Sequence, residues 1–124
     1  AFGGRFDQQI ASLHALYEYS AVFDRMVLIG DGNCATLLTP GVDHSIELVS
    51  GVEGPGCALL PVGNRCDSVS TSGLKWNLVE QPLALGELIS SSNRVVSADG
   101  VVSVRTSQPL LWCCGAKLSS VLAI

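Results

Sequence analysis

Charged side chains are scarce in this sequence: they make up 15% of its 124 residues, and aromatic side chains make up only 6%. The formal net charge at pH 7 is −4, and Lys and Arg are scattered, so the chain lacks the basic face that binds nucleic acids or membrane surfaces. Gly, Pro or charged residues interrupt every apolar run before it reaches the ~20 residues of a membrane-spanning helix. We therefore expect neither a nucleic acid nor a membrane as a partner.

The cysteines lack the spacing of a zinc site or of a secreted disulfide framework. Five are present, an odd number, with no C-x-x-C pair and only two histidines beside them. We expect reduced, mostly buried thiols, no metal ligands and a cytoplasmic protein. The chain begins at Ala1 rather than Met, so we also expect a processed or truncated amino end.

What the sequence does contain is enough apolar material for a core, at 48% hydrophobic residues and a mean hydropathy of +0.41. Residues 6–20 have the period of an amphipathic helix. The apolar residues that recur at three- and four-residue steps, and that predict its buried face, are Phe6, Ile10, Leu13 and Tyr17. Asp7 stands near the beginning of this segment, where a carboxylate can cap free backbone N–H groups.

Short strands separated by turn residues are predicted for the rest of the chain. Two strands, 26–29 and 34–39, flank a turn at 30–33 and end at Pro40-Gly41. The later strand candidates are 44–50, 57–62, 66–71, 74–78, 83–89, 101–106 and 110–114. This succession is typical of an antiparallel sandwich or barrel, so we expect a mainly β fold and a division of the chain into residues 1–40 and 41–124.

Two polar segments are the candidates for ligand binding in the β region. Trp76 lies among Thr, Ser, Gly, Lys and Asn, and Ser90 to Asn93 follow about a hairpin later. An indole ring can stack on a flat ligand while hydroxyl and amide groups bond to the edge of that ligand. The alternatives are that Trp76 is a core residue of the sandwich, as we expect for Trp112, and that residues 90–93 are an ordinary loop.

A third candidate precedes the predicted helix. Glycines ahead of a helix let the backbone approach a phosphate, and the helix N-terminus favours an anion. Arg5 would add a charged donor, and Asp7 could hold a metal-bound water or a ribose hydroxyl. The same residues also suit a turn, a surface cation and a helix cap.

Taken together and in order, five segments resemble the carboxyl-terminal half of eukaryotic thiamine pyrophosphokinases. The resemblance runs from about residue 3 to residue 113. The segments are Gly-Arg-Phe-Asp-Gln (4–8), Glu-Gly-Pro-Gly-Cys-Ala-Leu-Leu-Pro-Val-Gly (53–63), Thr-Ser-Gly-Leu-Lys-Trp-Asn-Leu (71–78), Leu-Ile-Ser-Ser-Ser-Asn (88–93) and Pro-Leu-Leu-Trp (109–112). The third and fourth are the most diagnostic.

This resemblance implies a homodimeric enzyme with its active sites between the subunits. The family transfers a diphosphate from ATP to thiamine, with Mg²⁺, and produces thiamine diphosphate and AMP. Residues 1–40 would then be the end of an α/β nucleotide-binding catalytic domain, a helix-and-strand fragment. Residues 41–124 would be an antiparallel β-sandwich that binds thiamine.

Position by position, the resemblance also implies roles for individual residues. Trp76 looks like the tryptophan that packs on thiamine, and Ser90 like the serine near the pyrimidine ring. Asn93 closes the same motif, and we expect it to shape the loop rather than to touch the ligand. Arg5 and Asp7 match the family's Gly-Arg-x-Asp motif and are the catalytic candidates, while Arg5 and Gln8 are the candidates for nucleotide binding.

The sequence departs from the family pattern in two places. The acidic segments that bind Mg²⁺ and ATP lie upstream of the Gly-Arg-x-Asp motif, so we expect Mg²⁺ to be held mainly by residues outside this chain and the chain alone to be inactive. After Asn93 the pattern changes, and Asp99 receives no role. Two other readings stay open: a non-catalytic β-module that binds thiamine or another small molecule, and a purely structural β-domain.

Overall fold

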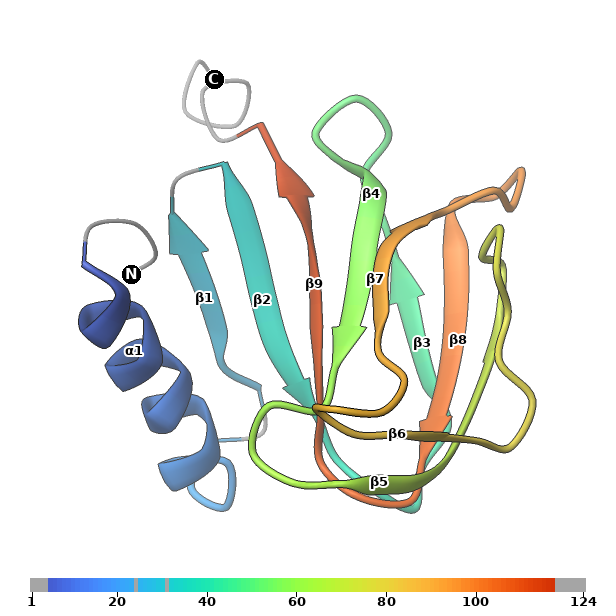
Figure 1. Cartoon of the computed structure of the whole chain (residues 1–124). Helices are drawn as coiled ribbons and strands as arrows, with labels where there is room; N and C mark the ends of the chain where they lie inside the picture. The colour runs from blue at the N-terminus through green and yellow to red at the C-terminus, as the bar shows by residue number, and fades with distance from the viewer. Residues whose placement is uncertain (1–4, 24, 31, 118–124) are drawn as a thin grey trace.

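One helix and nine strands make up the computed structural model, which describes residues 5–23, 25–30 and 32–117 (Figure 1). The elements are α1 (Phe6–Glu18), β1 (Val27–Gly30), β2 (Asn33–Leu38), β3 (His44–Glu47), β4 (Glu53–Leu60), β5 (Cys66–Ser72), β6 (Gln81–Leu83), β7 (Ser90–Arg94), β8 (Val101–Thr106) and β9 (Leu110–Ala116). Within these described ranges no helix is long and apolar enough to cross a membrane.

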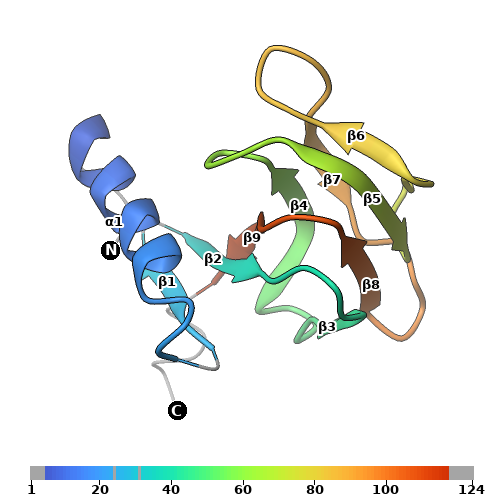
Figure 2. The ribbon, with the colours of Figure 1, turned by 90° about the horizontal axis from the view of Figure 1, so that it is seen from below.

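The strands form two antiparallel sheets. The larger sheet has the order β1-β2-β9-β4-β7, and the smaller has the order β3-β8-β5-β6. Seen from below, β3, β8, β5 and β6 lie across from β9 and β4, while α1 lies outside β1 and β2 (Figure 2). The predicted fold class, a mainly β antiparallel sandwich preceded by a helix and strands, is confirmed.

Two apolar clusters cover the opposite faces of the larger sheet. The inner cluster fills the space between the sheets and includes Trp112 of β9 with Val102 and Val104 of β8. The outer cluster joins Leu16 of α1 to the sheet through residues such as Leu111. Successive side chains of β9 therefore alternate between the two clusters, as the period of a strand requires. Trp112 is 3% exposed, which confirms the prediction that it is a core residue.

The buried face of α1 differs from the predicted one. Phe6 and Ile10 are 75% and 47% exposed, whereas Leu16, which the prediction omitted, is 1% exposed. The reason is that only the second half of the helix lies against the outer cluster, so its periodic apolar residues do not all meet the sheet. The N-cap residue is Arg5, whose side chain makes no capping hydrogen bond; its guanidinium pairs instead with the carboxylate of Asp7 in the first turn.

Two strand predictions and the interpretation of residues 90–93 as a loop are wrong in the segment that contains the candidate site. Residues 74–78 form no strand, and only Leu74 makes an isolated bridge, to Val95. The strand expected over 83–89 ends at Leu83, and residues 90–94, read as a possible loop, form β7. Ser-rich sequence favours turns in isolation, but here pairing with β4 decides the conformation.

Strands on both sides of the predicted boundary near Pro40 share one sheet. β2 pairs along its whole length with β9, from Asn33 opposite Gly115 to Leu38 opposite Leu110. The helix and first hairpin are therefore attached to the β region by backbone hydrogen bonds as well as by apolar contacts.

Candidate functional site

A bulge in β7 turns two polar side chains inward on one strand. Cys57 of β4 is opposite Asn93, and Leu59 is opposite Ser90, so three steps along β7 match two steps along β4. Ser92 lies within this extra step and has a positive φ of 54°. Residues three apart normally face opposite sides of a strand, but the bulge buries both Ser90 and Asn93, which are 9% and 4% exposed.

The Asn93 amide holds the backbone of Trp76 at both of its hydrogen-bonding groups. Its Nδ2 donates to the Trp76 carbonyl oxygen at 2.9 Å, and its Oδ1 accepts from the Trp76 N–H at 3.2 Å. Oδ1 also accepts from the Arg94 N–H, and Nδ2 donates to the Ser90 hydroxyl at 3.0 Å. Asparagine suits this position because its side chain carries donors and an acceptor together.

Further hydrogen bonds close the loop that carries Trp76. Asn77 Oδ1 accepts from the Leu74 N–H and from the Thr71 hydroxyl, both at 3.1 Å, and that hydroxyl accepts from the Leu78 N–H. Leu74 is 2% exposed and anchors the loop in the inner cluster. The loop is therefore held by packing on one side and by Asn93 on the other.

The Trp76 side chain itself lies outside the core. It is 55% exposed, so the interpretation of Trp76 as a core tryptophan is wrong. The Lys75 ammonium lies 4.7 Å from the centre of the ring, a cation–π contact. An exposed indole on a fixed backbone can stack on a flat ligand, and the contact with Lys75 shows that a cation can approach the ring.

Ser90 sits beneath this loop and has little access to solvent. Its hydroxyl oxygen accepts from Asn93, which leaves the hydroxyl hydrogen to be donated elsewhere. The structure thus brings Trp76, Ser90 and Asn93 together, with Asn93 engaged in shaping the loop. Which of them contacts a ligand remains a prediction.

The residues proposed for the nucleotide side lie at the beginning of α1. Arg5 and Asp7 form a two-bond ion pair, at 3.0 Å and 2.6 Å, on an exposed surface, and Gln8 is exposed beside them. The Arg5 guanidinium lowers the pKa of Asp7. In Figures 1 and 2 α1 lies beyond β1, whereas β7 is the opposite edge of the larger sheet. A single chain does not bring these residues to Trp76.

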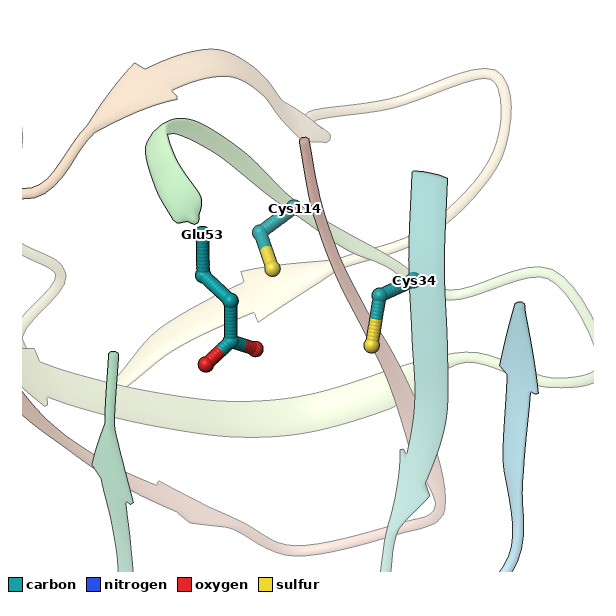
Figure 3. A group of neighbouring side chains, drawn as sticks. All are labelled: Cys34, Glu53 and Cys114. Atoms are coloured by element: carbon teal, nitrogen blue, oxygen red, sulfur yellow. The ribbon is translucent and has the colours of Figure 1, made fainter. Parts of the chain in front are cut away.

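A further group, which the sequence did not indicate, comprises Cys34 of β2, Glu53 of β4 and Cys114 of β9 (Figure 3). The two sulfur atoms and a carboxylate oxygen all lie within 4.8 Å of one another. Burial raises the pKa of Cys34, and it raises the pKa of Cys114 to about 12. Residues so far apart in sequence meet only because β9 lies between β2 and β4, so no local spacing could have revealed the group.

Cys34 and Glu53 also line a cavity of about 450 Å³. Its lining comes mainly from β1, β2 and β3, and its walls include Thr36, His44 and Trp112. This cavity does not include Trp76 or Ser90.

Comparisons with known proteins agree on one family. The family model described as the vitamin B1 binding domain of thiamin pyrophosphokinase matches residues 43–111. Thiamine pyrophosphokinase 2 of Oryza sativa subsp. japonica is 44% identical over 112 residues, 90% of this chain and 40% of that protein. Thiamine pyrophosphokinase 2 of Arabidopsis thaliana is 38% identical over 112 residues, which again are 90% of this chain and 40% of that protein. The chain therefore spans about two-fifths of the length of these relatives.

Solved structures agree with the sequence comparisons. The crystal structure of yeast thiamin pyrophosphokinase is 26% identical, with a TM-score of 0.84 over 95% of this chain and 38% of that one. The enzyme from Bacillus subtilis has the same fold, with a TM-score of 0.77 over 94% of this chain at 19% identity. The match covers the helix and first strands as well as the matched domain.

Proposed function

The chain belongs to the thiamin pyrophosphokinase family through its vitamin B1 binding domain, and from this premise we propose that it binds thiamine for transfer of diphosphate from ATP. The observation that carries the proposal is the exposed Trp76 ring on a backbone that Asn93 holds from two sides. In this proposal residues 41–124 are the thiamine-binding domain, and residues 1–40 are the end of the catalytic domain. The products are thiamine diphosphate and AMP.

Thiamine matches the chemistry of this loop. It is a flat, aromatic and cationic molecule, so an indole face offers it both stacking and cation–π attraction. The Lys75 ammonium lies 4.7 Å from the centre of the Trp76 ring, so a cation can approach this indole. The Ser90 hydroxyl, fixed by Asn93, would then exchange a hydrogen bond with the edge of the pyrimidine ring.

These residues contribute positioning rather than acid–base chemistry. The oxygen of the thiamine hydroxyl forms a bond to the β-phosphorus of ATP, the bond from that phosphorus to the oxygen shared with the α-phosphate breaks, and the hydroxyl loses its proton. Holding the vitamin in one orientation lowers the entropy cost of this reaction. Trp76 and Ser90 serve that purpose, and Arg5, Asp7 and Gln8 are assigned to the nucleotide.

A homodimer would supply both halves of the site. Because α1 packs beside β1 and β2 whereas β7 is the opposite edge of the larger sheet, the nucleotide residues of one subunit would face Trp76 of another. Phe6 and Ile10 are exposed apolar residues on α1, as expected if the first half of this helix packs on further parts of the enzyme. Measuring the molar mass in solution by light scattering tests the dimer.

The described residues do not fit Mg²⁺, the metal that the family's reaction implies. Mg²⁺ prefers an octahedral set of oxygen ligands, whereas Asp7 is already paired with Arg5 and the group around Glu53 contains two thiols. We assign Mg²⁺ and most of the ATP contacts to parts of the enzyme outside these residues. The chain alone is then expected to bind thiamine without turning it over.

We also propose a cytoplasmic location. Cys57, Cys66 and Cys114 are buried as free thiols, and burial raises the pKa of each. Such thiols are compatible with a reducing compartment.

The binding test uses the intrinsic fluorescence of the two tryptophans. Thiamine should quench the exposed Trp76 and leave the buried Trp112 as a reporter of the fold. Trp76→Ala should lower thiamine affinity by about 2- to 30-fold, the equivalent of ~0.5–2 kcal/mol, when measured by calorimetry. Val79→Ala is the matched control, because Val79 is 81% exposed on the same segment but offers no ring.

The outcomes separate the alternative functions. Equal affinity in Trp76→Ala and wild type would place thiamine elsewhere and overturn the proposed site. Formation of thiamine diphosphate from thiamine, ATP and Mg²⁺, in a form of the protein extended to the length of its relatives, would establish the kinase. Binding without turnover in that longer form would instead assign a non-catalytic thiamine-binding module.

A further inference from the structure

We propose that Cys34, Glu53 and Cys114 form a binding site for a thiophilic divalent cation, Zn²⁺, in the larger sheet. The site is independent of the proposed thiamine function. Its residues lie on β2, β4 and β9, and the hydrogen bonds of Asn93 connect Trp76, Ser90 and Arg94 instead. Figure 3 shows the two thiols and the carboxylate facing a common point.

Strand pairing fixes the two thiols relative to each other. Cys34 of β2 is directly opposite Cys114 of β9 in the antiparallel register. Directly opposed residues project to the same face of a sheet, with Cβ atoms ~4.5–5.5 Å apart. Both side chains point toward the inner cluster, where Cys114 is buried and Cys34 is half-buried.

Glu53 completes the group from the beginning of β4. Glu53 is opposite Ala116, which lies two residues from Cys114 and therefore on the same face of β9, although the β4–β9 register shifts between Glu53 and Cys57. A tight turn precedes it: the Glu53 N–H donates to the Val49 carbonyl at 2.8 Å, and Glu53 Oε1 accepts from the Val49 N–H at 3.1 Å. A hydrogen bond that orients a ligating carboxylate is a usual feature of metal sites.

The distances suit a tetrahedral ion. Zn²⁺ binds sulfur at ~2.3 Å and carboxylate oxygen at ~2.0–2.2 Å, so ligand atoms on one ion lie ~3.5–4 Å apart. The three atoms here lie within 4.8 Å of one another, and modest side-chain rotations close the remaining gap. Each thiol loses its proton to solvent when the ion binds, and the resulting two thiolates with a carboxylate favour Zn²⁺ over Mg²⁺ or Ca²⁺, which prefer oxygen ligands alone.

The neighbouring cavity gives the site an entrance and an open coordination position. Cys34 and Glu53 line this cavity of about 450 Å³, so an ion could enter beside them. His44 lines it as well, but its Nε2 lies 2.8 Å from the Thr39 carbonyl oxygen and is engaged there. Three protein ligands leave the fourth position to a water or a small donor molecule in the cavity, as in open zinc sites.

The test is a metal titration of the reduced chain. Zn²⁺ is titrated against a chromophoric chelator, with thiol counting to confirm that the cysteines are reduced, and Co²⁺ serves as a spectroscopic substitute. We expect one ion per chain, and cobalt spectra with thiolate charge-transfer bands and tetrahedral d–d bands. Cys34→Ala and Glu53→Gln should each lower Zn²⁺ affinity by at least about tenfold, judged by the effects of removing groups around zinc.

The matched control is Cys113→Ala. Cys113 is the neighbour of Cys114 on β9, but it packs on the outer cluster, so its loss removes one thiol without touching the site. Absence of binding at micromolar free Zn²⁺, cobalt spectra without thiolate bands, or equal losses in Cys113→Ala and Cys34→Ala would each overturn the proposal. Circular dichroism checks the fold, and Glu53→Gln, which preserves the shape of the side chain, keeps the test valid if a cysteine variant unfolds.

Discussion

Individual residues around Trp76 divide two tasks between them. Asn93 has four hydrogen bonds within 3.2 Å and is buried, whereas the Trp76 ring is exposed and contacts Lys75. The Asn93 amide fixes the backbone position of Trp76, and the Trp76 indole ring provides the surface that contacts a ligand. A ligand-binding aromatic gains affinity from such preorganisation, because less freedom is lost when the ligand binds.

Gly73, at the beginning of the Trp76 loop, offers a sharp prediction at this scale. Its φ is +87°, and a Cβ there would lie 2.5 Å from the Val101 carbonyl oxygen, a backbone atom. Gly73→Ala therefore combines a left-handed conformation with a clash, and we expect it to lower the free energy of unfolding by more than the ~1–2 kcal/mol of the conformation alone. Urea unfolding measures the change.

Gly86 is the matched control for this substitution. Its φ is +88°, nearly the same, but no heavy atom lies within 4 Å of the position a Cβ would take. Gly86→Ala should lower the free energy of unfolding only by the ~1–2 kcal/mol of the left-handed conformation. Equal losses in the two variants would show that the contact with Val101 adds nothing and that the loop can move away from β8.

At the scale of elements, sequence periodicity located α1 but not the part of it that is buried. Apolar spacing predicts which residues share a face, yet the extent of the sheet beneath the helix decides which of them are covered. Leu16 meets Leu28, Ala35 and Leu111, while Ile10 lies beyond that contact. This information belongs to β1, β2 and β9 and is absent from the helical segment.

Leu16 and Ile10 of α1 should differ in how much they contribute to stability. Leu16→Ala should lower the free energy of unfolding by about 2–5 kcal/mol, because it empties a fully buried position between α1 and the sheet. Ile10→Ala, in the same helix and also a large apolar residue, should change it by less than about 0.5 kcal/mol. Denaturant unfolding distinguishes them. A large loss for Ile10→Ala would mean that this residue is covered in solution.

The strand β7 shows why the site was only partly predictable. Its residue types were recognised as ligand-binding candidates from their order in the sequence, but Ser90 to Asn93 read equally well as a loop. Their common burial depends on a bulge against β4, and the hydrogen bonds to Trp76 depend on the loop that crosses β7. Both are long-range pairings, which local propensity does not encode.

For the molecule as a whole, the strongest sequence signals were the turn residues. They delimited β8 at its observed bounds of 101–106 and placed β2, β5 and β9 within a few residues, so the mainly β class followed directly. The assignment of strands to two sheets did not follow, since β1 and β2 join a strand from the far end of the sequence. The sequence also did not indicate the group formed by Cys34, Glu53 and Cys114, because its residues come from three strands that meet only in the folded sheet.

Alkaline stability is a property of the whole fold that the buried thiols should influence. Burial raises the pKa of Cys57 to about 11 from an ordinary value of 9.0. The folded state therefore favours the protonated thiol, so its contribution is complete below pH 9.0 and is lost as the pH rises toward about 11. Cys57→Ala should show a weaker fall in unfolding free energy across this window than wild type, measured by urea unfolding at each pH.

Cys57 is the appropriate position because it lies on β4 within the inner cluster and outside the proposed metal site. The comparison concerns the dependence on pH and is unaffected by a constant loss from the smaller side chain. Parallel curves for the variant and wild type would show that the Cys57 thiol titrates alike in the folded and unfolded chains.

The central place of β9 in the larger sheet bears on how the protein is made. Until residues 110–116 leave the ribosome, β2 has only β1 beside it and β4 has only β7, so the nascent chain carries two open strand edges. Insertion of β9 closes both edges at once and joins the β1–β2 hairpin to the rest of the sheet. Within the part of the chain that the structure describes, β9 is thus the strand that joins the two halves of the larger sheet, and we expect both edges to pair only after residues 110–116 have been synthesised.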